Sequence, residues 1–230
     1  MKIHGLQKMT LLDFPGRVAC TVFFGGCDMR CPFCHNAELL DGSAEPVMTE
    51  EELLSFLQKR QGLLDGVAIT GGEPLLQKDL PELARKIQDL GYPVKLDTNG
   101  THPDRLEKMI REGLVQYVAM DIKNCPERYA ETAGLKDFDL TPVRESAALL
   151  MEGQVDYEFR TTAVAELHDD QSFEGIGRWI RGAKRYFLQR FTDRETVPFE
   201  GLHAPDEETM RRWAEIVRPY IPSAALRGVD

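Results

Sequence analysis

The chain lacks the long apolar run that a membrane span needs, since none of its hydrophobic stretches approaches roughly 20 residues. Residues 1–6 also lack the apolar core of a signal peptide. No low-complexity tract and no linker rich in proline, glycine and serine divides the sequence. We therefore expect a cytoplasmic protein that forms one domain over residues 1–230 and does not bind membranes.

An excess of positive charge is also missing. The sequence has 28 basic and 38 acidic residues, which gives a formal net charge of −10. Such a balance disfavours broad contact with phosphate backbones, so we do not expect a nucleic acid partner. At 42% hydrophobic residues, the chain has enough apolar side chains to bury a sizeable core.

Cysteine is scarce, and its distribution argues against a disulfide framework. There are five cysteines, an odd number, and three of them form a tight group of Cys27, Cys31 and Cys34 with no fourth nearby. A four-iron cluster held by three thiolates leaves one iron without a protein ligand, and a substrate can bind there. The sequence therefore predicts a reactive metal site. Cys20 lies in an apolar run and is expected in the core, and Cys125 is expected to be an inert thiol.

A zinc site is the alternative interpretation of the cysteine group. Sites with three cysteines and one histidine exist, and here His35 or a distant histidine would be the fourth ligand. However, His35 directly follows Cys34, whereas zinc sites usually pair their ligands in two separated turns. The spacing therefore favours the iron-sulfur cluster.

The rest of the chain alternates between strand and helix patterns. The run 18–24 is continuously apolar and rich in β-formers, and Thr49 with Glu52 fits a capping box at a helix start. We expect strands at 18–24, 67–70, 94–97, 117–121, 157–162 and 186–189. We expect helices from 49, 81 and 103, at 141–153 and 173–181, and from about 206 to 217.

Six strands that are each followed by a helix predict an α/β fold with a parallel sheet, either doubly wound or curled into a barrel short of eight units. The strand order cannot be read from the sequence. Unusual polar groups stand at the carboxyl ends of these strands, and in parallel sheets those ends share one rim. We therefore expect one composite site.

Two motifs carry a family resemblance. The cysteines are spaced C-x3-C-x2-C with Phe33 just before the third, and Gly71, Gly72, Glu73 and Pro74 follow a predicted strand. Both resemble motifs of the radical S-adenosylmethionine (SAM) superfamily. The resemblance implies a [4Fe-4S] cluster on Cys27, Cys31 and Cys34, with SAM as the second cofactor.

Further segments resemble the activating enzymes of glycyl radical enzymes, and among them the activator of anaerobic ribonucleoside-triphosphate reductase. These segments are 7–16, 34–36, 96–101 and 118–123. The resemblance implies a partial TIM barrel, a (β/α)6 core over 18–190. Residues 1–17 would form an N-terminal extension, and residues 191–230 a C-terminal segment with the final helix.

The same resemblance implies the contacts of SAM. Phe33 and His35 would flank the adenine, and Gly72 with Glu73 would hold the methionine amine. Asp121 and Lys123 would lie beside the ribose and carboxylate, and Arg160 near the carboxylate or ribose. Asp97 and Asn99 would also belong to the cofactor-binding residues. For Lys123 and Arg160, pairing with structural carboxylates is the alternative.

The related pyruvate formate-lyase activator also implies a monovalent cation site, at Asp97, Thr98 and Asp121. The same stretch also reads as a turn ended by Gly100. One departure is clear: that activator has a late Pro-aromatic-His, whereas here Glu200 follows Pro198 and Phe199. His203 and His168 are expected on the surface, and Trp179 and Trp213 in helix packing.

The implied reaction is reductive cleavage of SAM to methionine and a 5′-deoxyadenosyl radical, which takes a hydrogen atom from a glycine of a partner enzyme. No protein acid or base is required, so the site orients SAM and excludes water. The implied partners are a glycyl radical enzyme, with anaerobic ribonucleotide reductase favoured, and a flavodoxin- or ferredoxin-type electron donor. Alternatives are a pyruvate formate-lyase activating enzyme, a 7-carboxy-7-deazaguanine synthase and a non-catalytic metal-binding module.

Overall fold

Six parallel strands form the centre of an eight-stranded sheet in the computed structural model, which describes residues 1–229. They are β3 (Ala19–Phe24), β5 (Gly66–Gly71), β6 (Val94–Thr98), β7 (Tyr117–Asp121), β8 (Asp156–Ala163) and β9 (Tyr186–Arg190). Each of the six predicted strands is confirmed to within one residue at either end. The continuous apolar runs were readable because both faces of these strands are covered.

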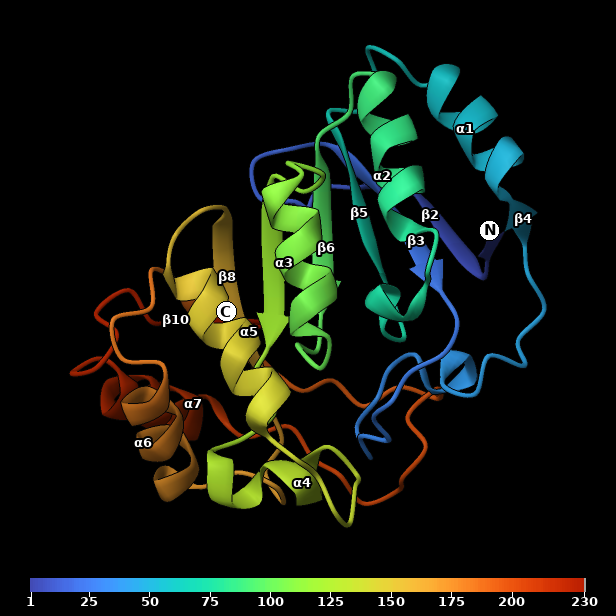
Figure 1. Ribbon diagram of the computed structural model, residues 1–230. Helices are drawn as coiled ribbons and strands as arrows, with labels where there is room; N and C mark the ends of the chain where they lie inside the picture. The colour runs from blue at the N-terminus through green and yellow to red at the C-terminus, as the bar shows by residue number, and fades with distance from the viewer. Residues whose placement is uncertain (230) are drawn as a thin grey trace.

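The strand order selects the barrel over the doubly wound sheet. The six strands follow one another across the sheet in chain order, whereas a doubly wound sheet reverses its order at one point. Right-handed connections between neighbours in chain order place the helices on one face. In Figure 1, α2 (Leu80–Asp89), α3 (Pro103–Arg111) and α5 (Thr141–Met151) lie in front of the sheet, and α1 (Glu50–Gln58) lies beside α2. The fold is therefore a partial TIM barrel.

Two further helices pack on each other beside the last strands, α6 (Asp170–Trp179) and α7 (Glu207–Val217). The start of α6 was predicted three residues too late, at Phe173. Asp169 accepts a hydrogen bond from the Ser172 amide at 2.8 Å and so caps the helix one residue before its true start. Trp213 stacks on Phe173 with ring centroids 4.6 Å apart, so its predicted helix-packing role is confirmed.

Both terminal segments join the sheet, which the sequence did not indicate. Strand β2 (Gly5–Thr10) pairs antiparallel with β3, and β10 (Ala225–Arg227) pairs parallel with β9 at the opposite edge. A separate pair is formed by β1 (Lys2–Ile3) and β4 (Met48–Thr49). The remaining elements are α4 (Tyr129–Thr132) and short 3-10 turns at Ala37–Leu39, Pro74–Leu76 and Pro126–Arg128.

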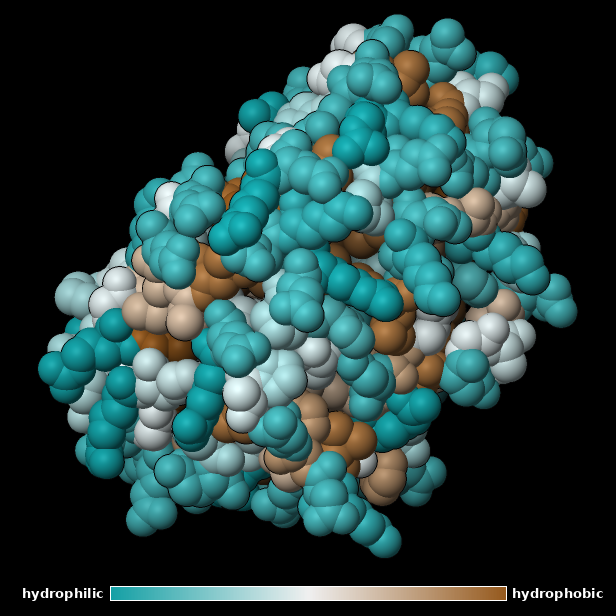
Figure 2. Space-filling view, viewed as in Figure 1, coloured by the Kyte–Doolittle hydropathy of each residue, from teal (hydrophilic) through white to brown (hydrophobic). Residues whose placement is uncertain are grey.

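The concave and convex faces of the sheet differ in chemistry. On β8, Glu158, Arg160 and Thr162 share one face because side chains alternate along a strand, and Arg160 and Thr162 line a pocket at the strand ends. The opposite face is apolar and packs against helices, where Leu83 and Ile87 of α2 are fully buried and contribute roughly 1.5–3 kcal/mol each. The outer, helical surface is largely hydrophilic (Figure 2). Among residues 1–229, no helix has the length and apolarity needed to cross a bilayer.

Candidate functional site

The carboxyl ends of the parallel strands surround one pocket, and it brings together most of the predicted site residues. The three cysteines come from the loop that follows β3, and the polar residues come from the ends of β5 to β8. The predicted residues that line the pocket are Cys27, Cys31, Phe33, Cys34, His35, Gly72, Asp97, Thr98, Asn99, Asp121, Lys123 and Arg160. Residues far apart in the sequence thus share one rim, because parallel strands all end on the same side.

The cysteine loop holds its thiols at the pocket wall. The amide of Met29 donates to the Cys27 sulfur at 3.4 Å, and the side-chain amide of Asn99 lies 3.8 Å from the same atom. Burial raises the pKa of Cys27 to about 12 and that of Cys31 to about 11. The thiols therefore carry protons in the metal-free protein, and a bound metal must displace them.

The loop offers three cysteine thiols, the ligand type that holds iron-sulfur clusters. Within residues 1–229, no group of three or more His, Cys, Asp or Glu side chains converges closely enough to hold one metal ion. Cys27, Cys31 and Cys34 line the same pocket. His35, the alternative zinc ligand considered above, has its Nε2 2.7 Å from the Thr192 carbonyl oxygen.

Asp28 anchors the cysteine loop to the turn that follows β6, a role that the sequence reading missed. Its carboxylate accepts hydrogen bonds from Asn99 Nδ2 at 2.8 Å and Thr101 Oγ1 at 2.6 Å, and His102 Nε2 lies 3.1 Å away. Burial alone would raise the pKa of Asp28, but these contacts outweigh it and lower the pKa to about 2. In the sequence, the feature that could have indicated this role is the acidic residue directly after the first cysteine of the motif.

The glycine turn after β5 packs directly on the cysteine loop. The Glu73 amide donates to the Gly26 carbonyl at 2.8 Å, and Asn36 Nδ2 donates to the Gly71 carbonyl at 3.0 Å. A Cβ atom at Gly72 would overlap the Gly26 carbonyl oxygen, so only glycine permits this approach. The two motifs that were recognised separately in the sequence are therefore parts of one backbone contact.

We expect Gly72→Ala to lose iron binding along with about 1–3 kcal/mol of stability, because the new methyl group pushes the cysteine loop away. Iron content after anaerobic reconstitution measures the first effect, and thermal unfolding measures the second. Gly91→Ala is the matched control: Gly91 has φ +89° with open space around its Cβ position, so alanine there costs a similar free energy without reaching the cysteines. Equal iron content in both variants would contradict the prediction.

Glu73 does not reach the pocket in this structure. It is 0% exposed, and its carboxylate accepts hydrogen bonds from Thr98 Oγ1 at 2.9 Å, the Asn99 amide at 2.7 Å and the Leu75 amide at 3.0 Å. Burial raises its pKa to about 7 against the opposing effect of these donors. Glu73 thus braces the end of β6, while the backbone of Gly71 and Gly72 faces the pocket.

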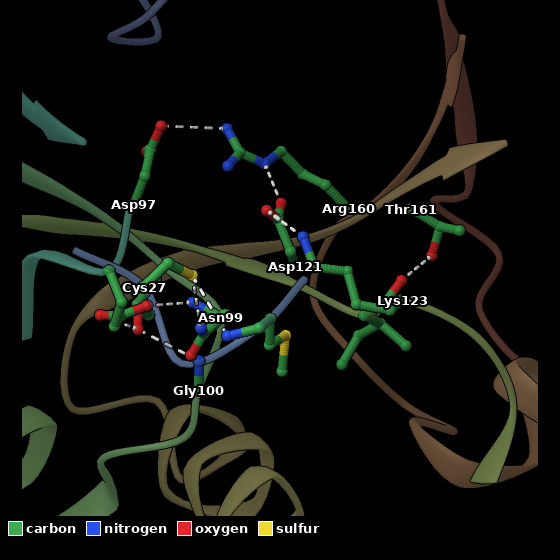
Figure 3. Close-up of polar contacts among 12 residues, drawn as sticks. Cys27, Asp97, Asn99, Gly100, Asp121, Lys123, Arg160 and Thr161 are labelled. Carbon is green, nitrogen blue, oxygen red and sulfur yellow. Dashed lines mark hydrogen bonds and ion pairs between the residues drawn. The ribbon is translucent and has the colours of Figure 1, made fainter. Parts of the chain in front are cut away.

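A chain of alternating charges crosses the pocket floor (Figure 3). Arg160 donates from Nη1 to Asp97 at 3.3 Å and from Nε to Asp121 at 3.0 Å, and Lys123 donates to Asp121 at 3.0 Å. Burial opposes ionisation of Asp121, but the charges of Arg160 and Lys123 outweigh it and lower the pKa of Asp121 to about 2. The same pairings raise the pKa values of Arg160 and Lys123 against burial. Asp121, Lys123 and Arg160 are therefore charged at neutral pH.

The side chains predicted to hold a monovalent cation are already engaged. Asp97 is paired with Lys95 and Arg160, and Asp121 is paired with Arg160 and Lys123. The Thr98 hydroxyl donates to Glu73. These three residues therefore do not fit a cation site in this chain.

The segment after β9 crosses the barrel mouth and meets the cysteine loop (Figure 1). Phe191 stacks on His35 with ring centroids 5.6 Å apart. Further along, Phe199 is exposed, and His203 is 74% exposed and paired with Glu166 at 2.7 Å. His203 is therefore a surface histidine, as predicted.

Two other predictions concern residues beside the pocket. His168 was expected on the surface and is instead buried, because its Nε2 lies 2.9 Å from the Lys123 carbonyl and joins the loops after β7 and β8. Burial lowers its pKa, so this histidine is neutral. Cys20 and Cys125 are buried and do not line the pocket, in agreement with their predicted roles.

The family follows from comparison with known proteins. The model of the radical SAM superfamily matches residues 21–169, which include the cysteine loop and the strands from β5 to β8. The chain belongs to the radical SAM superfamily, and the predicted class of enzyme is confirmed. Within it, the chain is 31% identical over 235 aligned residues to a provisionally named glycyl-radical enzyme activating enzyme of Methanocaldococcus jannaschii. That alignment covers 99% of this chain and 96% of the relative.

Two further relatives match about half of the chain. The pyruvate formate-lyase-activating enzyme of Clostridium pasteurianum is 33% identical over 54% of this chain and 52% of its own length. A 7-carboxy-7-deazaguanine synthase of Methanothermobacter thermautotrophicus is 33% identical over 47% of this chain and 42% of its own length. Among solved structures, Streptococcus suis SuiB bound to the precursor peptide SuiA has a TM-score of 0.71 at 16% identity, over 90% of this chain and 48% of SuiB. This last likeness concerns the fold.

Proposed function

We propose that the protein activates a glycyl radical enzyme, most specifically anaerobic ribonucleoside-triphosphate reductase, through reductive cleavage of SAM. The observation that carries the proposal is the pocket itself, in which three cysteine thiols lie beside a floor of paired charges. Likeness over nearly the whole chain to a glycyl-radical enzyme activating enzyme supports this class of reaction. We propose that residues 1–230 act as one radical SAM domain in the cytoplasm.

The proposed cofactor contacts follow from the pocket wall. Cys27, Cys31 and Cys34 would hold a [4Fe-4S] cluster, which supplies one electron to the sulfonium of SAM. Gly72 would accept the SAM ammonium through its backbone, whereas Glu73 keeps the adjoining turn in place. One face of the His35 ring stacks on Phe191, and the other face would stack on the adenine of SAM.

The charged floor suits the carboxylate and ribose of SAM. Lys123 and Arg160 are cations held in fixed positions by Asp121, and Asn99 supplies an amide close to the cysteine loop. Such preset donors bind a carboxylate without reorganisation. Phe33 lies beneath Lys123, whose Nζ is 5.9 Å from the ring centroid, so it helps to fix that cation.

The reductase is proposed as partner on the sequence segments described above, and a flavodoxin- or ferredoxin-type protein as electron donor. Pyruvate formate-lyase is the second candidate partner, favoured by the matching relative from Clostridium pasteurianum. The third candidate is a small-molecule substrate, favoured by the partial match to a 7-carboxy-7-deazaguanine synthase.

The test is to incubate the reconstituted, reduced protein with SAM and each candidate glycyl radical enzyme. We expect a glycyl radical signal in electron paramagnetic resonance with the reductase, and none with a reductase whose radical glycine is changed to alanine. A signal with pyruvate formate-lyase alone would move the assignment to that partner. SAM cleavage without a radical on either enzyme would contradict activation as the function.

A further inference from the structure

The interior of the barrel holds a lysine that neither cofactor explains. Lys95 lies on β6 two residues before Asp97, so the two side chains share the inner face of the strand. Lys95 is 2% exposed, which is rare for an ammonium group unless it has a partner. Its Nζ forms an ion pair with Asp97 Oδ1, and Asp97 itself lines the pocket. Lys95 therefore reaches the site through Asp97.

Glu158, a buried acid on the inner face of β8, is satisfied without Lys95. Glu158 accepts hydrogen bonds from Arg227 at 2.6 and 2.8 Å and from the Tyr117 hydroxyl at 2.7 Å. Across residues 1–229, Asp97 is the one acidic group within ion-pair distance of Lys95 Nζ. The pairing of Lys95 with Asp97 is thus specific, and loss of Lys95 would leave an oxygen of Asp97 without its ammonium partner.

Lys95 sets the charge of the whole floor. With Arg160 and Lys123 it makes three cations, against the two carboxylates Asp97 and Asp121, which leaves a surplus of one positive charge. One additional carboxylate from a ligand would neutralise the net charge of the cluster. Neutralisation is favourable in a buried site with a low dielectric constant. Without Lys95 the floor would be neutral and would need a cation from solution to reach the same balance.

We propose that Lys95 is the built-in cation of this site, so that the protein binds the carboxylate of SAM without K⁺ or Na⁺. The ligand in this statement rests on the proposed function, whereas the role of Lys95 towards Asp97 does not. Lys95 is a positioning residue: it holds Asp97, which in turn holds Arg160 at the pocket.

The experiment compares K⁺, Na⁺ and tetramethylammonium chloride at equal ionic strength. For the metal-free wild-type protein we expect the same Tm in all three salts, and for the reconstituted protein SAM affinities that agree within about twofold. Lys95→Ala removes the ammonium and leaves space beside Asp97. We expect its Tm in tetramethylammonium to fall by roughly 10 °C, since one partner of a buried ion pair is lost, and to recover partly in K⁺ or Na⁺.

Lys95→Met is the matched control, because methionine fills the same space without charge. We expect it to lose stability equally in all three salts, with no recovery in K⁺ or Na⁺. Lys184→Ala, which removes a 57% exposed lysine paired with Asp156, controls for a general salt effect. Wild-type SAM binding that weakens at least tenfold in tetramethylammonium would overturn the proposal, and so would identical salt profiles for Lys95→Ala and Lys95→Met. The Tm measurements test Lys95 even if SAM is not the ligand.

Discussion

Cys31→Ala is expected to abolish both the iron-sulfur chromophore and SAM cleavage while leaving the fold intact. Cys31 lies on the wall of the pocket, 6% exposed, and it is one of the three proposed ligands of the cluster. A cluster with two protein ligands is labile, so iron content should fall to background and SAM cleavage by at least about a hundredfold. Visible absorbance, iron analysis and the yield of 5′-deoxyadenosine measure these effects.

Cys125→Ala is the control for the loss of a buried thiol. Cys125 is 4% exposed, as buried as Cys31, but it lies off the pocket. We expect this variant to retain its iron and its cleavage activity. If Cys31→Ala bound zinc tightly through the remaining residues, or kept its iron, the proposed ligand set would be wrong.

Arg160→Met is expected to weaken SAM binding and to destabilise the protein. Arg160 bridges Asp97 and Asp121, so its loss separates the charged floor into two isolated pairs and removes its surplus positive charge. Breaking a buried ionic network costs about 3 kcal/mol, which corresponds to roughly 6–12 °C in Tm for a chain of this size. Loss of a charge-assisted contact should also weaken SAM binding at least tenfold. Calorimetric unfolding and equilibrium binding to the reconstituted protein test the two effects separately.

Arg178→Met controls for the removal of an arginine. Arg178 is paired with Glu174 on the surface of α6 and is 62% exposed, so its loss should change the stability by no more than about 0.5 kcal/mol. Arg160→Lys keeps the charge but cannot donate to both carboxylates in the same geometry. We expect it to recover part of the stability and little of the affinity. Unchanged SAM affinity in Arg160→Met would remove Arg160 from the binding site.

The strands and the metal motif could be predicted because their signals are local. The strands β3, β5 and β7 are buried along most of their length and therefore read as short apolar runs, and the helices between the strands carry caps and apolar stripes. The spacing of Cys27, Cys31 and Cys34 lies within one loop, so chain connectivity alone brings the thiols close together. The grouping of polar residues at one rim could also be predicted, because parallel strands all have their carboxyl ends on the same side of the sheet.

The edge strands gave no such signal. Strand β2 alternates weakly, and β10 has three residues, so neither has a hydrophobic pattern that distinguishes it from a loop. Their pairing is decided by the free edges that β3 and β9 offer. A six-stranded core has two such edges, and covering them satisfies backbone groups that would otherwise stay exposed.

The sequence by itself determined the order of strands and helices, the cysteine loop and the set of polar residues at the rim. Only the tertiary structure decided how those polar groups are paired. Glu73 accepts hydrogen bonds from Thr98 and Asn99, and Lys95 forms an ion pair with Asp97. His168 is buried and lies within hydrogen-bond distance of the Lys123 carbonyl. The sequence gives the chemistry of each side chain. Its partner depends on which strands are neighbours and on which face of the sheet each side chain lies. Those two facts exist only once the sheet has closed into its partial barrel.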